Sequence, residues 1–168
     1  MLALTSLMNF LAWLGLTNAG TPLAVGDTAP EAVSLNEQGQ AVRLSDFYGD
    51  GFTLFYFYPK SDTPGCTAQA CSLRDDFEQL QARGVRVVGV STDAPAAQLH
   101  FKQRYHLPFT LLADQERAVA RAFGVPLMLG MTRRQSFLIH NHRIVWRDLS
   151  ASTKEQARDI LEALKILN

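Results

Sequence analysis

Cysteine is scarce in this chain, which carries only Cys66 and Cys71 among its 168 residues. Two thiols cannot form the multi-bridge disulfide framework that stabilises small secreted domains. They also cannot complete a four-ligand zinc site, and the nearest histidine after them is His100. We therefore expect no metal site, and nothing in the sequence points to a cofactor. The two closely spaced thiols need a different explanation.

A net charge is also missing, because 16 Lys and Arg residues balance 16 Asp and Glu residues. Nucleic-acid binding depends on clustered basic side chains that contact phosphates, and the sequence has no basic run. We therefore exclude nucleic acid as a partner. With 47% hydrophobic and 19% charged residues, the composition is globular, and the length suits one ordinary domain.

Charged side chains are absent before Asp27. The densest apolar stretch there, Leu7–Leu16, is about as long as the hydrophobic region of a secretory signal and shorter than the ~20 residues of a membrane span. Thr17 and Ala19 suit a cleavage site, although the usual Lys or Arg near the start is missing. This pattern favours export to the periplasm, or a membrane tether if the segment is uncleaved. The alternative is a cytoplasmic protein with a packed, apolar N-terminal helix.

From residue 25 onward, short apolar runs alternate with helical patterns. Strands are predicted at residues 52–58, 85–91, 108–114, 135–140 and 143–148, and residues 41–47 are predicted as a short strand that runs into a turn. Helices are predicted at 66–83, 95–105, 115–123 and 153–167. The run at 52–58 is continuously apolar or aromatic, which is typical of a strand buried on both faces. This order predicts an α/β fold with a central mixed sheet and helices on both faces. The domain would span residues 25–168, after an extension at 1–24.

The first thiol, Cys66, falls at the start of a predicted helix. The strand at 52–58 leads into the loop at 59–65, on the sheet edge where open α/β folds gather ligands. In the first turn of the following helix, unpaired backbone N–H groups and the helix dipole favour the negative charge of a thiolate. Cys66 is therefore a candidate nucleophile. An inert, packed cysteine would more often lie in the middle of a helix, on its apolar stripe.

The second thiol, Cys71, lies five residues further along the same predicted helix. Residues at this spacing are about 140° apart around an ideal helix and about 8.6 Å apart between Cα atoms. A disulfide does not close beyond ~7 Å without movement of the backbone. A bond between Cys66 and Cys71 would therefore require the helix to unwind, which suits a catalytic cycle better than a scaffold. The alternative is that Cys71 is an inert packed thiol.

The segment "PKSDTPGC" has Pro59, Thr63 and Cys66 at the spacing P-x-x-x-T-x-x-C, and it resembles the signature of the peroxiredoxins. The cysteine five residues later resembles the atypical two-cysteine group called peroxiredoxin Q or bacterioferritin comigratory protein. Further similar segments follow in order: "GDTAP" at 26–30, "GVSTD" at 89–93, "LPFTLLAD" at 107–114, "AFGV" at 122–125 and "RQSFLI" at 134–139. The resemblance covers about residues 25–166 and implies a thioredoxin-like fold.

The resemblance also implies a role for each site residue. Cys66 would be the peroxidatic thiolate that attacks hydrogen peroxide or an organic hydroperoxide, and Cys71 would resolve the sulfenic acid to an intramolecular disulfide. Thr63 would hold the peroxide, Arg134 would stabilise the thiolate and the polarised O–O bond, and Pro59 would shield the pocket from water. A thioredoxin-like reductant would reopen the disulfide. Members of this group are often monomers.

Other interpretations of these residues stay open from the sequence alone. Thr63 is alternatively a capping or turn residue, and Arg134 a solvated partner of an acidic side chain. The chain is alternatively a thiol–disulfide oxidoreductase of the same fold, although that class normally carries Cys-x-x-Cys, or a redox-sensing module that uses the cysteine pair as a switch. Gln69 departs from the Glu that is common in the family, which puts in doubt any carboxylate-dependent network around Arg134.

Overall fold

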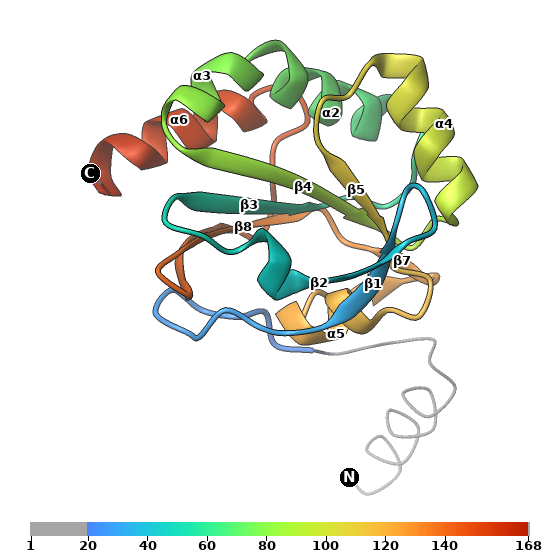
Figure 1. The fold of residues 1–168 in the computed structure, drawn as a ribbon, viewed down its shortest axis with the longest axis horizontal. Coiled ribbons are helices and arrows are strands. Elements are labelled where there is room, and N and C mark those ends of the chain that lie inside the picture. The colour runs from blue at the N-terminus through green and yellow to red at the C-terminus, as the bar shows by residue number, and fades with distance from the viewer. Residues whose placement is uncertain (1–19, 168) are drawn as a thin grey trace, which may run out of the picture.

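The central sheet has seven strands in the order β2-β1-β5-β4-β3-β8-β9 (Figure 1). The computed structural model describes residues 20–167 of the chain. The strands of this sheet are β1 (Val33–Asn36), β2 (Ala41–Arg43), β3 (Phe52–Phe57), β4 (Val85–Ser91), β5 (Thr110–Ala113), β8 (Gln135–His140) and β9 (Arg143–Asp148). A separate hairpin pairs β6 (Leu127–Met128) with β7 (Met131–Thr132).

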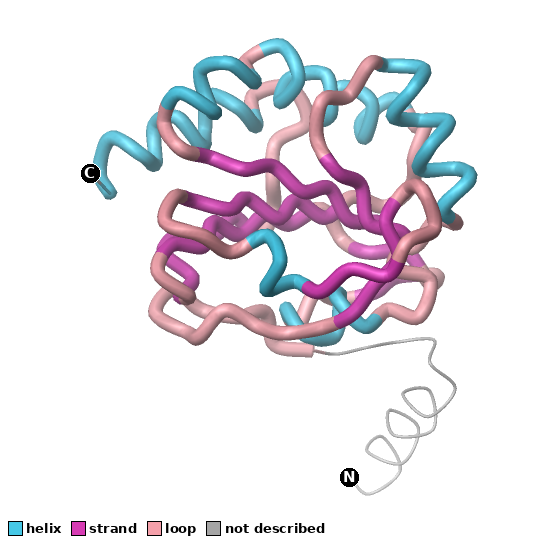
Figure 2. Tube along the Cα trace, in the orientation of Figure 1, coloured by secondary structure: helices cyan, strands magenta, loops and turns pink. Residues whose placement is uncertain are grey.

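The middle of the sheet is parallel and its flanks are antiparallel. β4 pairs in parallel with β3 on one side and with β5 on the other, whereas β8 runs antiparallel to β3 and to β9. All six residues of β3 are buried, as expected for a strand covered on both faces. The predicted mixed sheet is therefore confirmed, and Figure 2 shows its strands stacked between layers of helix and loop.

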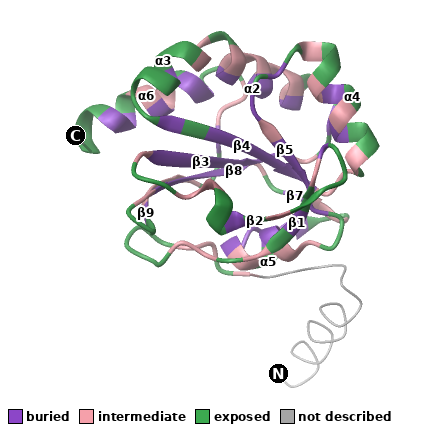
Figure 3. Cartoon of the chain, in the orientation of Figure 1, coloured by how far each residue is buried: buried purple, intermediate pink, exposed green. Residues whose placement is uncertain are grey.

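Helices cover both faces of this sheet (Figure 1). One face carries α2 (Pro64–Asp75), α3 (Phe77–Ala82), α4 (Pro95–Tyr105) and α6 (Gln156–Leu167). The other face carries the 3₁₀ helix η1 (Leu44–Phe47) and α5 (Ala118–Phe123). Each face has its own apolar core, and Figure 3 shows buried residues concentrated along the strands between the two layers. The predicted α/β class, with helices on both faces, is thus confirmed.

Three helices depart from the sequence-based predictions, and one of them, α5, begins at Ala118 rather than at residue 115. The first predicted helix is broken at Asp76, where φ is −102° and ψ is 16°, so α2 and α3 are separate. The last helix begins at Gln156 rather than at Thr153. Ahead of it, the Ser152 hydroxyl accepts a hydrogen bond from the Glu155 backbone N–H at 3.1 Å. Such a local side-chain bond competes with the helical pattern and delays the start of the helix.

The strand β1 and the hairpin of β6 and β7 are absent from the predictions. In β1, Val33 and Leu35 are exposed while Ser34 is buried, so the strand does not show apolar residues on its inner face. The alternation that identifies a strand in a sequence is therefore reversed. β6 and β7 have two residues each, which is too short for any periodic signal.

The predictions about the N-terminal segment concern residues outside the described range. An export signal, a membrane tether or a packed helix would involve residues 1–19. These alternatives and the boundary between an extension at 1–24 and a domain at 25–168 therefore stay predictions. Between residues 20 and 167, the structure contains no helix with the length and apolar character needed to span a membrane.

Candidate active site

The start of α2 is shaped by its own sequence. Thr63 is the N-cap residue, with extended backbone angles, and Pro64 is the first helical residue, where a missing N–H group costs little. Cys66 follows in the first turn, and the Thr67 N–H donates to the Thr63 carbonyl at 2.9 Å. The first thiol therefore lies at the helix N-terminus predicted from the sequence, and the residue is only 1% exposed.

The guanidinium of Arg134 lies against this thiol. Its Nη2 donates to Cys66 Sγ at 3.4 Å. Arg134 directly precedes β8, whose first residue, Gln135, pairs with Phe57 at the end of β3. This pairing brings Arg134 beside the loop that leads to Cys66. The Ala151 N–H then holds the Arg134 carbonyl at 3.2 Å. A cation fixed in this position stabilises negative charge on the sulfur.

Gly65 makes room for the contact between the guanidinium and the thiol. A Cβ atom at Gly65 would lie 3.1 Å from Arg134 Nη2 and 3.4 Å from Thr153 Cγ2. A side chain here would therefore press on the group that reaches Cys66. Sequence reasoning missed both Gly65 and Thr153 as site residues. A Pro-Gly pair looks like an ordinary turn, so no local pattern indicates this steric role.

Thr63 and Pro59 lie on the loop between β3 and α2. The Thr63 hydroxyl donates to the Lys60 carbonyl at 2.7 Å and makes no capping bond to the helix. Its oxygen lone pairs can still accept a hydrogen bond from a bound molecule. Pro59 is partly buried and lines a groove that also reaches Arg134. The loop thus gathers the three motif residues at one edge of the sheet, together with Arg134.

This groove has a volume of about 390 Å³ and an apolar rim. Met128 and Leu149 stand on the rim and are 57% and 40% exposed. The Thr132 hydroxyl donates to the Tyr58 carbonyl at 2.8 Å and ties β7 to the end of β3. The groove therefore joins apolar surface from the β6–β7 hairpin to Pro59 and Arg134, whereas Cys66 and Thr63 do not line it.

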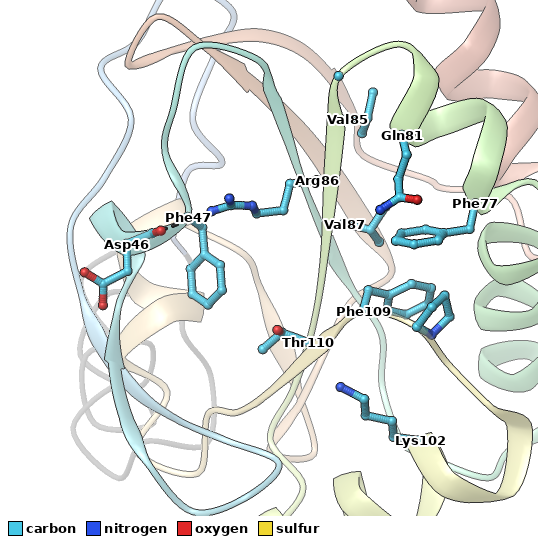
Figure 4. A pocket seen from close by; sticks show the side chains of 12 residues that line it. Asp46, Phe47, Phe77, Gln81, Val85, Arg86, Val87, Lys102, Phe109 and Thr110 are labelled. Carbon is cyan, nitrogen blue, oxygen red and sulfur yellow. Dashed lines mark hydrogen bonds between the residues drawn. The ribbon is translucent and has the colours of Figure 1, made fainter.

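A second cavity, of about 500 Å³, lies elsewhere in the molecule (Figure 4). Its walls come from η1, α3, the start of β4, α4 and the segment that enters β5, and they carry Arg86 and Lys102. Arg86 donates to the Asp46 carbonyl at 3.1 Å, and Lys102 Nζ lies 2.6 Å from the Glu37 carboxylate. None of the predicted site residues lines this cavity, and its two cations already have partners. It therefore does not belong to the candidate site.

Cys71 lies on the same helix as Cys66. α2 is continuous from Pro64 to Asp75, and both cysteines are free thiols, with Cys66 buried and Cys71 partly exposed. On a continuous helix, the five-residue spacing separates the Cα atoms by about 8.6 Å. The reduced protein therefore has the arrangement expected from the sequence, in which the two thiols cannot bond unless α2 unwinds.

Gln69 joins the site from the next turn of α2. It is fully buried, and its Oε1 accepts a hydrogen bond from Arg134 Nη1 at 2.6 Å. The family's usual Glu is replaced by Gln69 in this chain, which put a hydrogen-bond network around Arg134 in doubt. The bond to Arg134 is nevertheless present, with the amide oxygen of Gln69 as its acceptor. The Gln69 amide nitrogen turns to Gln156 at the start of α6. Sequence reasoning missed Gln156, because it lies 87 residues from Gln69 and no local pattern connects them.

Tyr56 is a further buried polar residue of this region. It packs in the same apolar cluster as Cys66 and has no exposed surface. Burial, and then negative charge on Tyr58 and on the two thiols, raise the pKa of its phenol well above the usual value. Within residues 20–167, the Tyr56 hydroxyl has no hydrogen-bond partner. The phenol is therefore a neutral, unpaired group in the core beneath α2.

Solved structures identify the class of this fold. Peroxidoxin BcpB from Mycobacterium tuberculosis superimposes with a TM-score of 0.80 at 30% identity, covering 87% of this chain and 99% of that one. A mutant of PrxQ from Xylella fastidiosa superimposes with a TM-score of 0.76 at 27% identity, covering 88% and 99%. The predicted thioredoxin-like fold of a peroxiredoxin is therefore confirmed.

Sequence comparison identifies the family. The family described as AhpC/TSA matches residues 25–147, and the chain therefore belongs to it. The chain is 47% identical over 126 residues to the putative peroxiredoxin bcp of Haemophilus influenzae, covering 71% of this chain and 81% of that protein. It is 39% identical over 144 residues to the chloroplastic peroxiredoxin Q of Oryza sativa subsp. japonica, covering 84% and 65%. The predicted resemblance to the peroxiredoxin Q and Bcp group is confirmed.

Proposed function

We propose that this protein reduces hydroperoxides and that Cys66 is its peroxidatic residue. The observation that carries the proposal is the 3.4 Å contact between Arg134 Nη2 and Cys66 Sγ in the first turn of α2. A guanidinium and a helix N-terminus both stabilise a thiolate, which is the nucleophilic form of cysteine. Membership of the AhpC/TSA family supports the same reaction class, a thiol-dependent peroxidase.

The first step is the attack of the Cys66 thiolate on one oxygen of the hydroperoxide. An S–O bond forms and the O–O bond breaks, so the sulfur is oxidised to a sulfenic acid and the peroxide is reduced to an alcohol or water. Arg134 donates to the oxygen on which negative charge develops, and Thr63 accepts a hydrogen bond from the peroxide O–H. Pro59 keeps water from the loop side of the pocket. The leaving oxygen takes up a proton as it departs.

The second step is the condensation of the sulfenic acid with Cys71. The Cys71 sulfur bonds to the Cys66 sulfur, the S–O bond of the sulfenic acid breaks, and the hydroxyl group leaves as water with the proton of the Cys71 thiol. Because the two residues are five apart on one helix, the first turns of α2 unwind to form this intramolecular disulfide. A thioredoxin-like dithiol then exchanges with the disulfide, is itself oxidised, and returns both cysteines to thiols.

Organic hydroperoxides are included among the substrates because an apolar surface lies next to Arg134. The groove of about 390 Å³ has the exposed side chains of Met128 and Leu149 on its rim. Burial of an alkyl chain against such side chains contributes about 25 cal/mol per Å² of apolar surface removed from water. We therefore expect a lower apparent KM for a hydrophobic alkyl hydroperoxide than for hydrogen peroxide.

Stopped-flow measurement of the oxidation of wild type, Cys66→Ser and Cys71→Ser by hydrogen peroxide tests the proposal. The wild type should react far faster than free cysteine, and Cys66→Ser, which keeps only Cys71, should react no faster than free cysteine. Cys71→Ser should keep the fast first step but accumulate sulfenic acid instead of the disulfide. A wild-type rate equal to that of free cysteine would remove the peroxidase function. Faster turnover with a thioredoxin and its reductase than with glutathione would support the proposed reductant.

A further inference from the structure

The hydrogen bonds around Arg134 continue beyond Gln69 into a second helix. Gln69 Nε2 donates to Gln156 Oε1 at 2.7 Å, and the Ser136 hydroxyl donates to the same oxygen at 2.7 Å. Gln69, Ser136 and Gln156 have no exposed surface, so water does not compete for these bonds. The chain of bonds therefore runs from α6 through α2 to the guanidinium that contacts Cys66 Sγ.

Arg134 determines the donor and the acceptor in each of these hydrogen bonds. A guanidinium only donates, so Gln69 must turn its oxygen toward Arg134 and its NH₂ group toward Gln156. That NH₂ group needs an acceptor, and Gln156 provides its carbonyl oxygen. Gln156 consequently turns its own NH₂ group away, and within residues 20–167 this buried nitrogen has no partner. A buried unpaired donor destabilises the fold, so this orientation of Gln156 serves the site rather than stability.

We infer that Gln156 is a positioning residue for the peroxidase reaction. It holds the Gln69 amide in the orientation that keeps Arg134 against Cys66. This inference rests on the proposed function, in which Arg134 stabilises the thiolate and the breaking O–O bond.

The test replaces Gln156 with Met, which is close to Gln in shape but offers no strong acceptor. Without its acceptor, the Gln69 amide can rotate, and Arg134 loses the oxygen that holds it. We expect Gln156→Met to lower the rate constant for oxidation of Cys66 by hydrogen peroxide by about tenfold or more. Gln156→Glu should restore the rate to within about threefold of wild type, because a carboxyl oxygen accepts the same two bonds in either protonation state.

Ser72→Ala is the matched control. The Ser72 hydroxyl accepts a hydrogen bond from the Ala157 N–H at 3.2 Å, which is the other polar contact between α2 and the start of α6. This variant weakens the packing of α6 on α2 and leaves the hydrogen bonds from Gln156 through Gln69 to Arg134 unchanged. We expect it to lower the midpoint of urea unfolding and to keep the wild-type rate of Cys66 oxidation. An equal loss of rate in Ser72→Ala and Gln156→Met would mean that helix docking, not positioning, controls the reaction.

A double variant keeps the inference testable if Gln156→Met does not fold. Gln69→Met with Gln156→Met removes the donor and its acceptor together, which is tolerated better than removing one of them. Because Gln156 acts through Gln69, the double variant should react at the rate of Gln69→Met alone, within about twofold. A further, multiplicative loss would overturn the inference, and so would a folded Gln156→Met with the wild-type rate. A wild type no faster than free cysteine would instead remove the proposed function itself.

Discussion

At the scale of single residues, the absence of a side chain at Gly65 controls how closely Arg134 approaches Cys66. A Cβ there would lie 3.1 Å from Arg134 Nη2, while Ala favours a helix over Gly by up to ~1 kcal/mol. We expect Gly65→Ala to lower the peroxide rate constant about tenfold and to leave the free energy of unfolding unchanged or higher. Stopped-flow kinetics and urea unfolding measure the two quantities. Gly49→Ala is the control, because a Cβ there meets nothing within 4 Å; equal rates for the two variants would refute the steric role.

The Tyr56 hydroxyl is a second residue-scale feature, because it is buried and unpaired within residues 20–167. A buried polar group without a partner costs about 1–3 kcal/mol relative to an apolar replacement of the same shape. We therefore expect Tyr56→Phe to raise the free energy of unfolding by about 1 kcal/mol at pH 7. Urea unfolding of the reduced protein measures this change. Tyr58→Phe is the contrast, since the Tyr58 hydroxyl bonds to Gln98 and its loss should destabilise the protein.

The pKa of Tyr56 adds a pH dependence to the same comparison. Burial raises this pKa above the value of 10 that the phenol has when exposed. Above about pH 10 the unfolded chain therefore loses a proton that the folded protein keeps, so the free energy of unfolding falls as the pH rises. The stability linked to Tyr56 is present below pH 10 and is lost toward its folded pKa. The advantage of Tyr56→Phe over wild type should thus be larger near pH 11 than at pH 7; a constant difference would contradict the shift.

At the scale of elements, the proposed mechanism requires α2 to be folded in the reduced protein and unwound in the oxidised protein. In the reduced protein it is one helix, tied to α6 through Gln69 and Ser72. We expect oxidation with one equivalent of hydrogen peroxide to raise amide hydrogen exchange across residues 63–75 and at the first turn of α6, because the ties between the helices are lost. β3 and β4 should stay protected. Cys71→Ser, treated identically, should keep its protection. A disulfide-bonded protein with unchanged exchange in α2 would contradict the unwinding step.

The elements whose bounds the sequence predicted correctly are those flanked by clear turn or proline signals. β4, α4, β8 and β9 have the predicted bounds, because each combines an apolar pattern with a clear turn or proline at its start or end. β1 was missed because Val33 and Leu35 face outward. The residues of the candidate site likewise fall into those that a local sequence pattern predicts and those that it does not. Cys66, Thr63 and Pro59 follow from one local motif, whereas Gln156 depends on a contact made 87 residues away, which only the folded chain reveals.

At the scale of the whole molecule, the first described residues pack against the end of α5 and against β9. The Leu23 N–H donates to the Phe123 carbonyl at 3.0 Å, and Arg147 Nη1 donates to the Pro22 and Leu23 carbonyls at 3.1 and 2.7 Å. Gly124 has a φ of 68°, and a Cβ on it would overlap the Thr21 carbonyl. The family match begins only at residue 25. We therefore expect the cooperative folding unit to reach further toward the N-terminus than the region that matches the family.

Two truncated forms test where this unit begins. A form that starts at Gly20 keeps the contacts of Leu23. A form that starts at residue 25 loses the backbone hydrogen bond between Leu23 and Phe123, the two bonds from Arg147 and the two bonds between Ala24 and Asp27, so it should unfold at lower urea, by about 1–3 kcal/mol. Gly124→Ala sharpens the comparison. In both forms the new side chain meets the strain of a positive φ, worth about 1 kcal/mol, but only in the longer form does it also displace residues 20–22. Gly124→Ala should therefore destabilise the form starting at Gly20 more than the form starting at residue 25. Equal losses in the two forms would mean that these residues do not contribute to the folded domain, and the boundary would then stand at residue 25.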